Sequence, residues 1–230
     1  ILGSFGFDFE LEQARHHATP SIGITLFGGE HIEGGEEPLK RAELAMFKAK
    51  AAGRNTLRFF EEQMQAEVSA RAALEADLRT ALAQQQLLLH YQPQVVGAGR
   101  ITGVEVLVRW QHPQRGMVPP VQFIPLAEEC GLILPLGQWV LETACAQLTA
   151  WAHDPALAHL TVAVNVSADQ FKQADFVATV LATLERTGAN PRRLKLELTE
   201  SMLVDDVEAI IAKMDALKAR GVAFSLDDFG

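Results

Sequence analysis

The chain has 230 residues, 48% of them hydrophobic and 21% charged, which is typical of a folded globular protein of one or two domains. Its formal net charge of -9 argues against a general nucleic-acid coat, because non-specific binding to nucleic acid needs a basic surface. No apolar run approaches the roughly 18 residues of a membrane span, and the N-terminal residues lack a signal-peptide pattern. Cys130 and Cys145 form no CxxC motif, so we expect two reduced, mostly buried thiols in a cytoplasmic protein.

Residues 1–62 predict a small α/β segment. A strand is expected within Pro20–Phe27, and helical spacing of apolar residues covers Glu36–Ala52, with Gly53 as the stop signal. Thr56–Phe60 is expected to close a hairpin or a sheet edge. One helix between two short strands is too little for an independent domain. We therefore expect these residues to be the end of a larger domain.

Residues 63–86 contain no Gly or Pro and predict a linker helix that runs into the first helix of the next domain. Glu75 and Arg79 have the spacing of an ion pair along a helix. An apolar residue recurs every fourth position at Leu74, Leu78 and Leu82. This repeat is too short to establish a coiled coil, and we interpret the segment as a rigid spacer.

Residues 87–230 predict a second domain, in which strands alternate with helices. Two adjoining strands at 87–96 and 100–110 are close enough to pair with each other. Further strands are expected at 160–167, 194–200 and 222–228, each preceded by a helical segment. Repeated helix–strand units predict a parallel sheet, either open or closed into a barrel.

The strand at 101–110 alternates strictly, with Glu105, Leu107 and Arg109 on the face opposite Val104, Val106 and Val108. Taken alone, a solvent-facing row would explain these polar residues. Three later strands repeat the pattern, however, and each puts a carboxylate or an amide near its carboxyl end. The residues concerned are Glu105, Asn165, Glu197 and Asp227, followed in the next turn by Asp228.

Carboxylates that converge at one end of a sheet repel one another unless a cation lies between them. Oxygen ligands of this kind suit Mg²⁺ or Mn²⁺. Two such ions could activate a water molecule and stabilise a phosphate leaving group, and Arg109 is suited to bind a phosphate oxygen. From the pattern alone, a metal site and scattered surface carboxylates remain equally plausible.

A series of motifs in order along residues 70–230 resembles the EAL family of cyclic di-GMP phosphodiesterases. These are Tyr91-Gln-Pro93, Glu105-Val-Leu-Val-Arg-Trp110, Phe123-Ile-Pro-Leu-Ala-Glu-Glu129, Asn165-Val-Ser167, Glu197-Leu-Thr-Glu200 and Asp227-Asp-Phe-Gly230. The resemblance implies a TIM-like α/β barrel with one antiparallel strand, which in this chain would stop after its fifth strand. It also implies an enzyme that hydrolyses cyclic di-GMP to linear pGpG in bacterial signalling.

The resemblance assigns roles residue by residue. A two-metal site with Mg²⁺ or Mn²⁺ would be held by Glu105, Asn165, Glu197, Asp227 and Asp228. The dinucleotide would be contacted by Gln92, Leu107 and Arg109. Glu105, Asp227 and Asp228 would be catalytic, and Glu200 would act indirectly by steadying the loop after the fifth strand.

A second resemblance concerns the N-terminal segment. Ser21-Ile-Gly-Ile24 and the stretch Ala42–Asn55 resemble the C-terminal third of a GGDEF (diguanylate cyclase) domain. Glu43 stands where that family usually has Asp, and Phe47 where it usually has Tyr. The signature loop of the cyclase is not in this chain, so we expect no cyclase activity from it. Together the two resemblances imply a fragment of a GGDEF-EAL protein.

One departure from the EAL motif is Val106, which replaces the usual Ala. By the alternation Val106 faces the helices, so we expect a packing adjustment and no lost ligand. The family's later Lys, Glu and Gln would follow Gly230, and we therefore expect little turnover from these 230 residues alone. The alternatives are a non-catalytic cyclic di-GMP receptor and a regulatory GGDEF-EAL module. A homodimer through the EAL domain and an upstream membrane anchor stay open.

Overall fold

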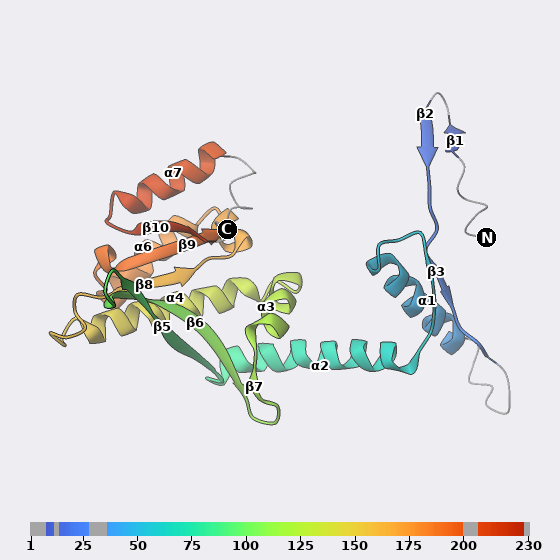
Figure 1. Cartoon of the computed structure of the whole chain (residues 1–230), viewed down its shortest axis with the longest axis horizontal. Helices are drawn as coiled ribbons and strands as arrows, with labels where there is room; N and C mark the ends of the chain where they lie inside the picture. The colour runs from blue at the N-terminus through green and yellow to red at the C-terminus, as the bar shows by residue number, and fades with distance from the viewer. Residues whose placement is uncertain (1–7, 12–13, 28–35, 200–206, 228–230) are drawn as a thin grey trace. The chain divides into compact units, whose positions relative to one another are not determined.

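The computed structural model describes residues 8–11, 14–27, 36–199 and 207–227. The chain divides into two compact units, Ile1–Ala73 and Leu74–Gly230 (Figure 1). The boundary falls inside α2 (Glu62–Ala83), the helix predicted over residues 63–86.

The first unit contains a short βαβ arrangement. β3 (Ile22–Ile24) pairs in parallel with β4 (Leu57–Phe59), and α1 (Glu36–Ala51) connects them. Since the pairing is parallel, the hairpin alternative for the second strand is wrong. A separate antiparallel pair, β1 (Asp8–Leu11) and β2 (Ala14–His17), was not predicted, because these strands lack the β-branched alternation by which strands are recognised.

Helix α1 lies directly on β3. Ala45 and Ala49 are fully buried, and a Cβ added to Gly23 would lie 1.9 Å from the backbone oxygen of Ala42. Glu36 and Glu37 in the first turn and Lys48 and Lys50 in the last turn complement the helix dipole. Gly23 is therefore required by the close approach of helix and strand.

The described residues of the second unit form a sheet of six strands. They are β5 (Leu87–Val96), β6 (Arg100–His112), β7 (Gly116–Val118), β8 (Thr161–Asn165), β9 (Leu194–Thr199) and β10 (Ala223–Asp227). The order is β10-β9-β8-β6-β5, with β7 paired to β6. The pairs β5–β6 and β6–β7 are antiparallel, and the others are parallel. The predicted pairing of the first two strands is confirmed, whereas β7 was not predicted.

Helices connect the parallel strands and lie along the outer side of the sheet (Figure 1). They are α3 (Pro120–Glu129), α4 (Ile133–Trp151), α5 (Ala168–Lys172), α6 (Phe176–Thr187) and α7 (Val207–Lys218). The helix predicted over 169–188 is in fact two. Ser167 and Gln170 form a capping box for α5, and the extended backbone of Gln173 (ψ 135°) ends it before α6 begins.

The core between sheet and helices is made of the apolar faces predicted from the alternation. Val104, Val106, Val162 and Val164 pack with the leucines of β9 and with residues of α4, α6 and α7. Cys145 of α4 lies in this core, and burial raises the pKa of its thiol to about 12, so it is protonated and unreactive at neutral pH. Among the described residues, no helix is both long and apolar enough to cross a membrane.

The C-terminal half of α2 is part of this second unit. Leu78 and Ala81 are buried in a second cluster with Trp110, Phe123 and Leu136, and Leu74 and Leu82 pack against its edge. The apolar repeat recognised in the sequence is therefore used for packing within the unit.

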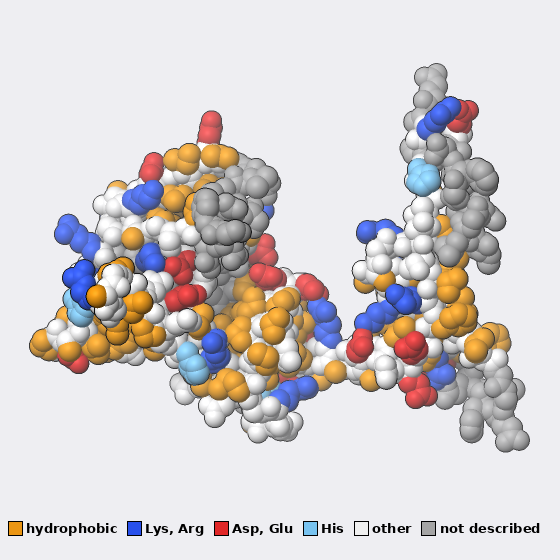
Figure 2. Space-filling model, in the orientation of Figure 1, with side chains coloured by type: hydrophobic (Ala, Val, Ile, Leu, Met, Phe, Trp, Pro, Cys, Tyr) orange, Lys and Arg blue, Asp and Glu red, His pale blue; other side chains and the backbone are white. Residues whose placement is uncertain are grey.

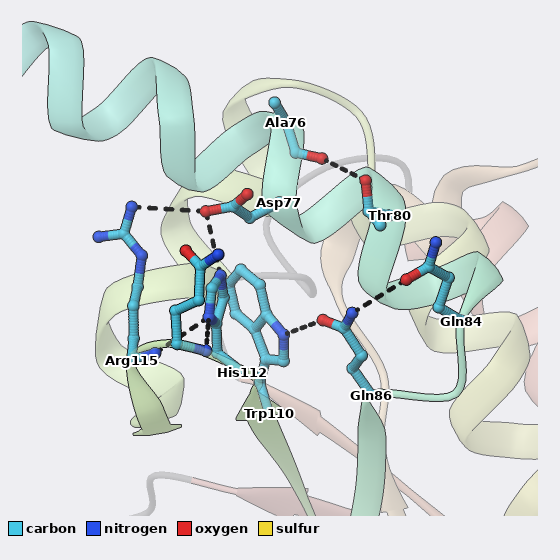
Figure 3. A network of polar contacts seen from close by, with 9 residues as sticks. Ala76, Asp77, Thr80, Gln84, Gln86, Trp110, His112 and Arg115 are labelled. Atoms are coloured by element: carbon cyan, nitrogen blue, oxygen red, sulfur yellow. Dashed lines mark hydrogen bonds and ion pairs between the residues drawn. The ribbon is translucent and has the colours of Figure 1, made fainter.

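A polar network fixes α2 to the β6–β7 hairpin (Figure 3). The ring nitrogen Nδ1 of His112 accepts hydrogen bonds from the backbone N–H groups of Gln114 (3.0 Å) and Arg115 (3.1 Å). The proton must therefore be on Nε2, which lies 3.0 Å from Oδ2 of Asp77. Nearby, Nε1 of Trp110 donates to Oε1 of Gln86 at 3.3 Å. His112 is thus a buried histidine whose two ring nitrogens both have partners within the unit.

We predict that Asp77→Ala lowers the free energy of unfolding by about 1–3 kcal/mol, because the buried Nε2–H of His112 loses its acceptor. Urea denaturation measures this. The matched control is Glu75→Gln on the same helix, which breaks an exposed ion pair with Arg79 and should change stability much less. Equal effects of the two substitutions would contradict the structural role of Asp77.

Candidate functional site

The strand register brings the predicted polar residues onto one face of the sheet. Glu105 pairs with Ala163, Asn165 with Glu197, and Glu197 with Ser225. All of these alternate with the buried valines and leucines, so their side chains are on the face away from the helices. The face is polar although the opposite face is the core of the unit.

Glu105 and Asn165 contact each other across β6 and β8. The side-chain Nδ2 of Asn165 donates to Oε1 of Glu105 at 2.8 Å. This orientation leaves the carbonyl oxygen of Asn165 and the second oxygen of Glu105 available to other partners. The pair therefore presents oxygen atoms at the carboxyl end of the sheet, where parallel α/β folds place their active sites.

Glu197 is the most buried acid of the site, with 8% of the residue exposed. Its Oε1 accepts a hydrogen bond from Oγ of Ser225 at 3.0 Å and lies 3.0 Å from Nζ of Lys195. Lys195 also donates to Oε1 of Gln94 at 3.1 Å. Lys195, Ser225 and Gln94 were not predicted as site residues, although strand parity puts the first two on the polar face.

The contact between Lys195 and Gln94 shows that the sheet is curved. Lys195 is on β9 and Gln94 on β5, and β8 and β6 lie between them. In a flat sheet these strands would be roughly 14 Å apart, with side chains standing perpendicular to the sheet. The side chains can meet only if the strands curl around the polar face, as they do in a barrel.

The residues expected to contact substrate lie next to this group. Gln92 of β5 is exposed and pairs directly with Glu105 in the antiparallel register. Leu107 and Arg109 follow Glu105 on the same face of β6, and both are half-buried. The Arg109 guanidinium donates to the backbone oxygen of Val108 at 2.9 Å, which holds it beside the strand.

The structure describes the remaining predicted residues only in part. Asp227 is placed by its backbone on β10, opposite Thr199, and its side chain lies outside the described residues. Glu200 and Asp228 lie entirely outside them. Within the described residues no three His, Cys, Asp or Glu side chains converge on one metal position. The described donors, two carboxylates and an amide oxygen, fit a hard cation such as Mg²⁺, and further ligands must complete the site.

Val106 lies where the alternation predicted. It is 3% exposed and packs in the core between sheet and helices. The departure from the Glu-Ala-Leu motif therefore changes the packing layer and leaves the polar face unaltered.

Comparison with known proteins identifies the family. The sequence model of the EAL domain matches residues 75–230, more than half of the chain. The chain belongs to the EAL domain family. The match begins within α2 and covers every strand of the second unit.

Two relatives align over nearly the whole chain. The "Bifunctional diguanylate cyclase/cyclic di-GMP phosphodiesterase MucR" of Pseudomonas aeruginosa is 43% identical over 223 residues, 96% of this chain and 32% of the relative. The "Cyclic di-GMP phosphodiesterase PdeR" of Escherichia coli is 35% identical over 230 residues, 100% of this chain and 34% of the relative. The chain thus spans about a third of the length of these relatives.

Solved structures share the fold of the second unit. The PaMucR phosphodiesterase in complex with c-di-GMP is 47% identical, with a TM-score of 0.66 over 69% of this chain and 64% of that one. The EAL enzyme Bd1971 with cAMP and cyclic di-GMP is 28% identical, with a TM-score of 0.65 over 84% of this chain and 50% of that one. The α/β fold of the second unit is therefore the TIM-like barrel fold of EAL domains, as predicted.

We predict that Val106→Ala lowers the free energy of unfolding by about 1–3 kcal/mol, because it leaves a cavity in the core, and leaves metal affinity unchanged. The matched comparison on the other face is Glu105→Gln, which keeps an acceptor for Asn165. It should weaken metal binding with little loss of stability. Urea denaturation and Mn²⁺ titration measure the two effects, and the same profile for both variants would contradict the assignment of faces.

Proposed function

We propose that the second unit is part of a metal-dependent phosphodiesterase that hydrolyses cyclic di-GMP to linear pGpG. The observation that carries the proposal is the convergence of Glu105, Asn165 and Glu197 on the concave polar face of an EAL domain. Its support includes the relatives MucR and PdeR, whose names state a cyclic di-GMP phosphodiesterase, and the c-di-GMP in the complex of PaMucR.

In this proposal, Mg²⁺ or Mn²⁺ is held at two positions by Glu105, Asn165, Glu197, Asp227 and Asp228. The bound ions would supply an activated water molecule and stabilise charge on the phosphate. The protein's own contribution is to fix its ligands before any ion arrives. Asn165 is oriented by Glu105, and Glu197 by Ser225 and Lys195.

Substrate binding would use the neighbouring residues of the same face. Arg109 offers a planar guanidinium that suits a phosphate oxygen pair, and Gln92 lies opposite Glu105 to accept or donate hydrogen bonds. Leu107, between Glu105 and Arg109 on that face, would provide an apolar contact. Glu200 is proposed to act indirectly, by steadying the loop that follows β10.

We also propose that residues 1–62 are the C-terminal part of a GGDEF domain, that 63–86 are a linker helix and that 87–230 are the N-terminal two-thirds of the EAL barrel. The alignment with MucR, named a bifunctional diguanylate cyclase and phosphodiesterase, extends well upstream of residue 75. The first unit also exposes large apolar side chains, visible in Figure 2, that would be covered in a larger domain. They include Leu26, Phe27, Leu39, Phe47 and Phe59.

A homodimer through the EAL domain and a cytoplasmic site of action belong to the same proposal. Light scattering of the full-length protein measures the first. A mass that corresponds to one chain at all concentrations would contradict the dimer.

The decisive experiment is nucleotide analysis of the full-length protein with cyclic di-GMP and Mg²⁺ or Mn²⁺. We predict that pGpG forms, that EDTA abolishes its formation, and that Glu105→Gln lowers kcat by more than about 100-fold. Binding of cyclic di-GMP without any linear product would instead identify a receptor. Turnover that persists in EDTA would contradict the metal-dependent mechanism.

A second prediction concerns Arg109→Ala, which should lower kcat/KM for cyclic di-GMP by about 10- to 100-fold, because it removes charge-assisted hydrogen bonds to phosphate. Arg100, exposed at the start of the same strand, provides the matched control. Arg100→Ala removes the same charge and should leave kcat/KM unchanged. Equal losses in both variants would indicate long-range attraction of the nucleotide in place of a contact.

A further inference from the structure

Lys195 places a positive charge inside the face that the proposed function assigns to metal ions. Its side chain is 24% exposed and comes from β9, two residues before Glu197. It reaches across the curved sheet to Gln94 at 3.1 Å and lies 3.0 Å from Oε1 of Glu197. The ammonium group is therefore held between two acceptors on opposite sides of the face.

Both described donors to Glu197 contact the same carboxylate oxygen. Ser225 Oγ and Lys195 Nζ are each 3.0 Å from Oε1. Because two donors already occupy Oε1, the second oxygen, Oε2, is the one directed to other partners. The carboxylate is thus oriented for contact through a single oxygen.

The charge of Lys195 has opposite consequences with and without a metal ion. Glu197 is 8% exposed, and a buried carboxylate is costly unless a positive partner compensates it. Without metal, Lys195 is that partner. With metal, a divalent cation and an ammonium group share one carboxylate, and two positive charges so close repel each other.

We propose that Lys195 is a positioning residue that serves as the counter-ion of Glu197 in the metal-free protein and lowers the affinity of the site for divalent cations. The inference rests on the proposed function, since it assigns Glu197 to a metal ion. In this role Lys195 stabilises the metal-free site and destabilises the metal-bound site.

The test compares Lys195→Met, which removes charge and hydrogen bonds, with Lys195→Gln, which removes the charge and keeps a donor. The full-length protein is used, and the readouts are the Kd for Mn²⁺ from calorimetry and the Tm in chelator. Both variants should bind Mn²⁺ about tenfold more tightly. The metal-free Tm should fall by about 4 °C in Lys195→Met and by less in Lys195→Gln.

Lys218→Met is the matched control, because it removes the same charge from an exposed position on α7, over the ring of Phe224. It should leave the Mn²⁺ affinity unchanged. If Lys195→Met does not fold, Lys195→Gln carries the comparison.

Unchanged or weaker Mn²⁺ binding in the Lys195 variants of a protein that hydrolyses cyclic di-GMP would overturn this inference and leave the proposed function intact. Absence of Mn²⁺ binding and turnover in the unaltered protein would overturn both.

Discussion

The register between β6, β8 and β9 is the constraint on which the second unit depends. It sets Glu105 opposite Ala163 and Asn165 opposite Glu197. A slip of one residue in any of these strands would turn its polar side chains into the helix-covered core and its valines or leucines toward the site. The packing of Val104, Val162 and Leu196 under the helices therefore also fixes the polar face.

The two faces of this sheet are stabilised in different ways. The outer face gains stability from apolar burial, to which the buried side chain of Val106 contributes. The inner face holds acids close together and is stabilised only by partners for each of them. Asn165 pairs with Glu105, while Ser225 and Lys195 pair with Glu197, so the described acids of the site are oriented before any ligand is bound.

β6, the strand that carries Glu105 and Arg109, also contacts α2. Trp110 and His112 continue the same strand beyond the site. His112 contacts Asp77 of α2, and Trp110 contacts Gln86 just after the helix. The buried ring of His112 can satisfy both its nitrogens only with this helix and the β7 turn in place. The start of the EAL domain and the edge of its candidate site are therefore supported by one strand.

Residue parity and helical spacing were sufficient to predict the strands of the second unit other than β7, the order of its helices, and the shared face of Glu105, Asn165 and Glu197, because neighbours in sequence determine them. They could not predict that helix 169–188 is split, since the extended backbone at Gln173 that ends α5 is marked by no Gly or Pro in the sequence. They also could not assign Lys195 and Gln94, which are 101 positions apart. Only the curvature of the assembled sheet brings those two side chains together, and curvature is a property of all the strands at once.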